Sequence, residues 1–135
     1  MNSGMKSETK AISKYSVKEI LAEEPYHLME LFRNEYGYDI PETIDTVEDM
    51  RMAGKLLGRL ANSYSYLMQL SSYAKLDVRT ARRDKNNKQK VEDAIDRKNV
   101  IDTFGEAVGL KYKAISRMLT IKQQINEELK MTDGR

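Results

Sequence analysis

Apolar residues recur at helical spacing over most of the chain, and two long segments dominate the pattern. In residues 46–83, apolar or small residues alternate steps of three and four, the 3.5-residue period of helices that pack along a partner helix. This seam comprises Met50, Ala53, Leu57, Leu60, Tyr64, Leu67, Ser71, Ala74, Val78 and Ala81. Thr46-Val-Glu-Asp49 is a capping pattern. A single helix from Thr46 to Arg83 is therefore predicted, about 55 Å long at 1.5 Å per residue.

A second long helix is predicted from Val91 to about Met131. Its apolar positions are Ile101, Phe104, Val108, Tyr112, Ile115, Leu119 and Leu129, with Ile95 and Ile125 flanking the same face. The polar run Asp84–Lys90 separates the two segments. Two long helices joined by a short polar turn are expected to fold back as an antiparallel hairpin over residues 46–131.

The N-terminal third predicts shorter elements. Residues 1–15 are polar and aperiodic, which favours a flexible arm. Ser16-Val-Lys-Glu19 is a capping box, and a short helix is expected to run to about Glu24. Pro25 suits the first turn of a second short helix, and Gly37 is expected to end that helix in the left-handed conformation. Residues 16–45 thus form an acidic short-helix region, and 132–135 a flexible tail. The expected fold is a single all-α domain.

Four glycines lie inside the predicted long helices, as Gly54 and Gly58 in the first and Gly105 and Gly109 in the second. A glycine in a helix interior costs about 1 kcal/mol relative to alanine, so each pair needs a compensation. Close backbone approach between packed helices is the favoured interpretation. A kink or a crowded contact between subunits is the alternative.

The composition excludes several classes of function. The chain has no cysteine and a single histidine, His27, which removes disulfide scaffolds, thiolate metal sites and cysteine nucleophiles. With no second histidine or cysteine nearby, His27 is interpreted as a surface or packing residue. No apolar run approaches the roughly 20 residues of a membrane span, and the first ten residues contain no secretory signal. We expect a cytoplasmic, non-enzymatic protein without catalytic residues, metal or cofactor.

The net charge of +2 hides a segregation along the chain. Residues 1–18 carry +3, residues 19–50 carry −9 and residues 51–135 carry +8. Sixteen residues, 75–90, account for +5 of the last value. A near-neutral total therefore does not argue against an anionic partner, because the charge is concentrated at the end of one predicted helix.

The candidate nucleic-acid-binding residues all lie in this segment, which we call the basic tip: Lys75, Arg79, Arg82, Arg83, Lys85, Lys88 and Lys90, against Asp77 and Asp84. Arg79, Arg82 and Arg83 share one helical face. Such residues bind phosphates with salt-dependent, sequence-tolerant affinity. A charge run can equally be a solvated helix face, and that alternative stays open.

Three tyrosines on the first long helix, Tyr64, Tyr66 and Tyr73, are candidates for stacking on unpaired bases. Core packing is the competing interpretation, most clearly for Tyr64 because it occupies the seam. No zinc-finger or RNA-binding signature is present, so any nucleic-acid contact is expected to be mostly to the backbone.

Residues 50–131 resemble the phage UvsY-type recombination mediator family, small helical proteins that bind single-stranded DNA and help load a recombinase. The similar stretches are Leu70-Ser-Ser-Tyr-Ala-Lys-Leu-Asp-Val-Arg79, the polar turn, Tyr112-Lys-Ala-Ile-Ser-Arg117 and Ile121-Lys122. The resemblance implies a ring-like homo-oligomer that contacts DNA near the end of the first long helix, through Lys75 and Arg79 here. It also implies a recombinase or single-strand-binding protein as partner, and the host cytoplasm as location if a phage encodes the chain. Residues 1–45 have no counterpart in this family.

Two interpretations of function follow. The first is an oligomeric accessory protein that binds single-stranded DNA through the basic tip. The second is a helical protein–protein assembly or regulatory module that binds no nucleic acid. In both, the residues expected in the core or oligomer seam are Met50, Leu57, Leu60, Tyr64, Leu67, Val78, Ile101, Phe104, Val108, Ile115 and Leu119.

Overall fold

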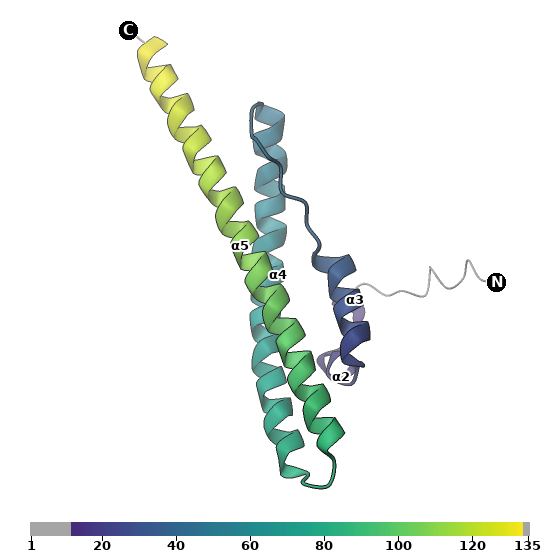
Figure 1. Ribbon diagram of the computed structural model, residues 1–135. Helices are drawn as coiled ribbons and strands as arrows, with labels where there is room; N and C mark the ends of the chain where they lie inside the picture. The colour runs from purple at the N-terminus through teal and green to yellow at the C-terminus, as the bar shows by residue number, and fades with distance from the viewer. Residues whose placement is uncertain (1–11, 134–135) are drawn as a thin grey trace, which may run out of the picture. The chain divides into compact units, whose positions relative to one another are not determined.

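The computed structural model describes residues 12–133, and every regular element among them is helical (Figure 1). The elements are a 3-10 turn η1 (Ile12–Lys14) and the helices α2 (Val17–Ile20), α3 (Pro25–Tyr36), α4 (Val47–Arg83) and α5 (Lys88–Asp133). The long helices α4 and α5 pack against each other, which confirms the predicted all-α helical hairpin. The described residues form two compact units, 12–38 with 66–105 and 39–65 with 106–133.

The N-termini of α2 and α4 are capped as the sequence predicts. The Ser16 hydroxyl accepts from the Glu19 N–H at 3.1 Å, and the Glu19 carboxylate accepts from the Ser16 N–H at 2.9 Å. At the start of α4 the Thr46 hydroxyl accepts from the Asp49 N–H at 3.0 Å, and the Asp49 carboxylate accepts from the Thr46 N–H at 3.1 Å. Pro25 occupies the first turn of α3. These bonds satisfy backbone donors that a helix start leaves free.

The turn between the long helices is shorter than predicted. Asn87 caps α5, because its side-chain oxygen accepts from the Lys90 N–H at 3.0 Å. Lys88 and Lys90 therefore lie in the first turn of α5, and not in a polar loop running to residue 90. Asp84 shapes the remaining turn by accepting from the Asn86 N–H at 3.3 Å. Asparagine is a strong helix N-cap, and this signal corrects the predicted start at Val91.

Two predictions for the N-terminal region are wrong in detail. Ile12, expected in a flexible arm, is buried in η1, and its N–H donates to the Glu35 carboxylate at 3.1 Å. Residues 1–11 of that arm lie outside the described residues. The helix after Ser16 ends at Ile20, not near Glu24, because the Glu24 carboxylate caps α3 by accepting from Tyr26 and His27.

Gly37 ends α3, but not in the left-handed conformation, since its φ is −81° and its ψ is 61°. A Cβ at this position would lie 2.6 Å from the backbone oxygen of Arg33. Glycine is needed here for this close approach, not for a positive φ. At the other end of the chain, α5 extends into the tail expected over residues 132–135 and ends at Asp133.

The first unit, residues 12–38 and 66–105, has its core where α2 and α3 meet the turn end of the hairpin (Figure 1). Phe32 is fully buried and packs edge-to-face against Tyr36 and Phe104, with ring centroids 5.3 and 5.6 Å apart. Burial raises the pKa of the Tyr36 hydroxyl. The other large buried side chains of this core are Ile12, Ile20, Leu28, Leu31, Leu67, Leu70 and Ile101.

Arg97 ties the short helices to the hairpin within this unit. Its side chain is 10% exposed and donates from Nη1 to the Glu23 backbone oxygen at 3.1 Å. Its Nη2 lies 3.4 Å from the Asp77 carboxylate on α4, while Nε has no hydrogen-bond partner among the described residues. One guanidinium thus links α5, α4 and the segment between α2 and α3.

The second unit, residues 39–65 and 106–133, is built on Ala53, Leu60, Val108 and Ile115, all buried, with Ile44 from the preceding connector. The seam residues of both units are thereby largely buried within one chain. Leu60, Leu67, Val78, Ile101, Val108 and Ile115 are buried, and Met50, Leu57, Phe104 and Leu119 are half-buried. The buried side chains among them form the core of the hairpin.

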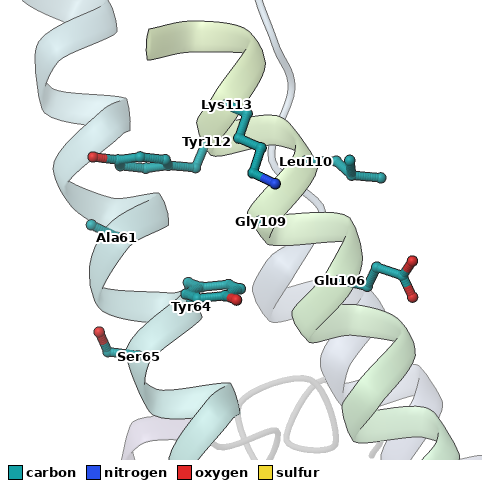
Figure 2. A pocket seen from close by; sticks show the side chains of 8 residues that line it. All are labelled: Ala61, Tyr64, Ser65, Glu106, Gly109, Leu110, Tyr112 and Lys113. Carbon is teal, nitrogen blue, oxygen red and sulfur yellow. The ribbon is translucent and has the colours of Figure 1, made fainter.

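Tyr64 is the seam residue that the structure places differently. It is 40% exposed, and its ring lies over Gly109 of α5 (Figure 2). Ile125 and Leu129, expected on the core face of the second helix, are exposed as well. The sequence pattern assigned these residues to the core because each fits the helical period of its neighbours.

The two glycine pairs behave differently. Gly105 is buried within the first unit, where a Cβ would lie 3.6 Å from the Leu67 Cβ. The predicted explanation, close packing of the two helices, therefore applies to this glycine. Gly109 admits the Tyr64 ring in the second unit. Gly54 and Gly58 have no atom within 4 Å of an added Cβ, and close approach is therefore the wrong explanation for that pair.

Candidate nucleic-acid interface

A small apolar cluster holds the basic tip in place. Val78 and Ala81 of α4 are buried against Ala94 of α5, and Val91 and Ile95 pack around them. Because the inward positions carry these apolar side chains, the residues between them point outward. The last two turns of α4 and the first turn of α5 consequently present their basic side chains to solvent.

All seven residues of the basic tip are exposed: Lys75, Arg79, Arg82, Arg83, Lys85, Lys88 and Lys90. Within residues 12–133 none of them forms an ion pair. The two acidic residues of the segment are engaged elsewhere, Asp77 with Arg97 and Asp84 with the Asn86 N–H. The sequence prediction of a locally uncompensated positive cluster therefore agrees with the geometry.

Lys75 differs from the other six because it lies near an acidic group. Asp102 on α5 accepts from the Ser71 hydroxyl at 2.5 Å and from the Lys98 ammonium at 2.6 Å. Burial opposes ionisation of Asp102, but the hydrogen bonds from Lys98 and Ser71, with the charges of Lys98 and Lys75, lower its pKa below the usual value. Lys75 is thus partly balanced, and Arg79, Arg82 and Arg83 carry the unbalanced charge of α4.

The outward face of α4 also carries apolar side chains that the sequence analysis did not single out. Met68 and Leu76 are 52% and 55% exposed, and Tyr73 is 43% exposed. Leu76 shares a face with Arg79 and Arg83 by its spacing of three and seven residues. These positions do not follow the helical period of the buried seam. This difference in the sequence would have identified them as exposed apolar residues. Leu76 thus lies on the same face as these arginines, and Tyr73 lies one turn before Leu76.

The three tyrosines proposed as base-stacking residues differ in exposure and in the unit to which they belong. Tyr73 is exposed and belongs to the unit of the basic tip. Tyr66 is half-buried in the same unit, and burial raises the pKa of its hydroxyl. Tyr64 lies in the second unit, over Gly109. Tyr73 is therefore the tyrosine whose ring is both exposed and grouped with the tip.

Four carboxylates of the N-terminal region are engaged inside that region. Glu19 and Glu24 cap α2 and α3, Glu23 pairs with His27, and Glu30 pairs with Arg33 at 2.7 Å. His27 is exposed, in agreement with a surface residue. In the described part of the chain these groups leave the basic tip unneutralised.

A groove of about 530 Å³ lies in the second unit, lined by Ala61, Tyr64, Ser65, Glu106, Gly109, Leu110, Tyr112 and Lys113 (Figure 2). Tyr64 and Tyr112 turn their rings toward the opposite helix, while Glu106 and Leu110 point away from α4. Among residues 12–133 there is no group of three or more His, Cys, Asp or Glu side chains that could hold a metal ion. No helix in that range has the length and apolar character to cross a membrane.

The chain matches no protein-family model, no curated protein and no solved structure.

Proposed function

We propose that the protein is a non-enzymatic accessory protein that binds single-stranded DNA through the basic tip. The observation that carries the proposal is the exposure of all seven basic side chains without an ion-pair partner among the described residues. Lysine and arginine held in this way release counterions from a phosphate backbone when they bind it, which supplies affinity with little dependence on base sequence.

The neighbouring apolar side chains favour single-stranded over double-stranded DNA. Leu76 shares the outward face of α4 with Arg79 and Arg83, and the exposed Tyr73 lies one turn before Leu76. Unpaired bases can stack on an aromatic ring, with about 1–3 kcal/mol per base, whereas paired bases are hidden inside the duplex. Arginine side chains contact the phosphates in this arrangement, and Tyr73 receives a base.

The proposal includes a role in recombination, which rests on the resemblance to UvsY-type mediators. On that basis the partners are a recombinase or a single-strand-binding protein, and the location is the cytoplasm, or the host cytoplasm for a phage protein. Co-purification of the intact chain with a recombinase on single-stranded DNA tests this part. Binding to DNA without any effect on recombinase loading would contradict it.

The test of DNA binding is a titration of a labelled mixed-sequence oligonucleotide, single- and double-stranded, with the intact chain. The combined variant Arg79→Gln, Arg82→Gln and Arg83→Gln removes the unbalanced charge of α4 and keeps good helix formers. We expect its affinity for the single strand to fall by at least about tenfold at low salt. Substitution Tyr73→Ala is expected to weaken single-strand binding and to leave duplex binding unchanged.

A matched control variant separates the effect of the basic tip on affinity from the effect of net charge. The variant Lys55→Gln, Arg59→Gln and Lys113→Gln loses the same three charges, from exposed residues of the second unit. Retained affinity in this control, with loss in the tip variant, supports the proposal. Equal loss in both variants, or none in either, would contradict it.

A second candidate function is a helical protein–protein assembly or regulatory module that binds no nucleic acid. The observation in its favour is the exposure of large apolar side chains on the C-terminal half of α5, such as Ile121, Ile125 and Leu129. A defined oligomer without affinity for any oligonucleotide at low salt would select this function.

A further inference from the structure

The C-terminal half of α5 carries a second apolar face, on the side away from its core residues. We call it the outer stripe, and it consists of Ala107, Leu110, Ala114, Met118, Ile121, Ile125 and Leu129. The steps between these residues are three, four, four, three, four and four. This is an 11-residue repeat of about 3.67 residues per turn, so the stripe follows one side of a nearly straight helix.

The outer stripe is separate from the hairpin core. The core positions Val108 and Ile115 are buried, whereas Leu110 is 61% and Leu129 58% exposed. Ala107, Ala114, Ile121 and Ile125 are exposed too, and Met118 is half-buried. Figure 2 shows Leu110 pointing away from α4. From Ala107 to Leu129 the stripe extends about 33 Å at 1.5 Å per residue.

We propose that the outer stripe is the contact surface for a second copy of this chain, with the two α5 segments antiparallel. An apolar helix face of six turns exposed to water favours burial against a partner. This assembly uses a surface distinct from the seam, most of whose residues are buried inside the hairpin. The inference goes beyond DNA binding and does not depend on it.

The sizes of the stripe residues favour an antiparallel second copy. With Met118 at the centre, Ala107 faces Leu129 of the other copy, and Ala114 faces Ile121. Leu110 then faces Ile125. The two alanines thus stand opposite bulky side chains, which is how facing helices fill space without voids. In a parallel pair alanine would face alanine and leucine would face leucine, leaving gaps at two levels.

The charges along the same helix agree with this orientation. Residues 106–122 carry a net charge of +3, and residues 123–133 carry −2. An antiparallel copy brings opposite charges together at each end of the contact, whereas a parallel copy brings like charges together. Complementary size and complementary charge therefore select the same arrangement.

The first test is the mass of the intact chain in solution, by native mass spectrometry and light scattering. We expect wild type to be a dimer or an even multiple at micromolar concentration, and Ile125→Glu to halve its mass with unchanged helix content. Gln123→Glu is the matched control, since it adds the same charge at an exposed residue outside the stripe. A monomeric wild type, or an unchanged mass for Ile125→Glu, would overturn the proposal.

The second test fixes the orientation and uses the absence of cysteine from the chain. Mild oxidation should couple Met118→Cys to itself, because this residue lies at the centre of the pair. Ala107→Cys and Leu129→Cys should each stay uncoupled alone and form a mixed disulfide when combined, since bridged Cα atoms must lie within about 7 Å. Self-coupling of Leu129→Cys with the efficiency of Met118→Cys would contradict the antiparallel pair.

These tests are independent of the proposed function. The tip variant with Arg79, Arg82 and Arg83 replaced by Gln should keep the wild-type mass. If the protein is a dimer but binds no DNA, the proposed role of the outer stripe in dimerisation stands and only the DNA-binding proposal is overturned.

Discussion

The aromatic ring of Tyr64 on α4 occupies the place that a side chain on Gly109 of α5 would take. A Cβ at Gly109 would lie 2.9 Å from Cε1 and 3.2 Å from Cδ1 of Tyr64 (Figure 2). The glycine thus admits a ring between the helices of the second unit. Tyr64 thus contacts α5 although the residue is 40% exposed.

The glycines of the long helices should respond unequally to alanine. Gly58→Ala is expected to raise the free energy of unfolding by about 1 kcal/mol, because alanine is the better helix former and its Cβ meets open space. Gly109→Ala should raise the free energy of unfolding by less than Gly58→Ala, or lower it, because the Tyr64 ring must move. Urea unfolding of both variants measures the difference, and an equal gain in both would show that the ring contact is unimportant.

A charge at Leu60 should disrupt the hairpin core. Leu60 is fully buried, so Leu60→Glu places an unpaired carboxylate among apolar side chains and should cost more than about 3 kcal/mol. Asn62→Glu is the control, since Asn62 is an exposed residue of the same helix and lies outside both the seam and the outer stripe. Circular dichroism should show unfolding at a lower temperature for the Leu60 variant, with little loss of helix for the control. Equal stability would refute the core assignment.

Arg97 should stabilise the fold through packing and hydrogen bonding, and its positive charge should not be needed for stability. Arg97→Ala removes the bond to the Glu23 carbonyl and leaves a cavity, so it should destabilise the protein by about 2–4 kcal/mol. Arg97→Met keeps apolar volume and removes a buried cation whose Nε has no partner in the described residues. The Met variant should therefore be more stable than the Ala variant, as measured by thermal unfolding. The reverse order would mean that the ionic contact with Asp77 dominates.

The pairing of Asp102 with Lys98 and Ser71 predicts an acid dependence of stability. The folded-state pKa of Asp102 is lower than its usual 3.8, so its contribution is complete above that value and is lost as the pH falls through the folded-state pKa. Asp102→Asn should lower the free energy of unfolding at neutral pH and have a smaller effect at about pH 2. Unfolding curves at both pH values test this, and a difference independent of pH would contradict it.

Much of the fold could be predicted from local sequence. The helices were predicted from the capping signals at Ser16 and Thr46, from Pro25 and from the period of the seam. The hairpin was predicted from two long helices joined by a short turn. The capping role of Asn87 was missed because a polar run hides a helix start that begins with lysines. Ile12 was missed because one apolar residue in a polar arm has no periodicity.

The parts that could not be predicted depend on which face each helix presents. Tyr64, Ile125 and Leu129 all fit a helical period, yet the structure exposes them. In α5 two apolar stripes share one helix, and periodicity alone does not say which stripe meets α4. The exposed apolar residues of α4, Met68 and Leu76, could be identified once the buried face of α4 was known.

The salt dependence of single-stranded DNA binding tests the central claim most directly. If all seven residues of the basic tip neutralise phosphates, the logarithm of the affinity should fall against the logarithm of salt concentration with a slope of about −5. Replacing Arg79, Arg82 and Arg83 by Gln should reduce that slope to about −3, because four contacts remain. A slope near zero for the intact chain, or the same slope for both proteins, would contradict the claim that the basic tip binds DNA.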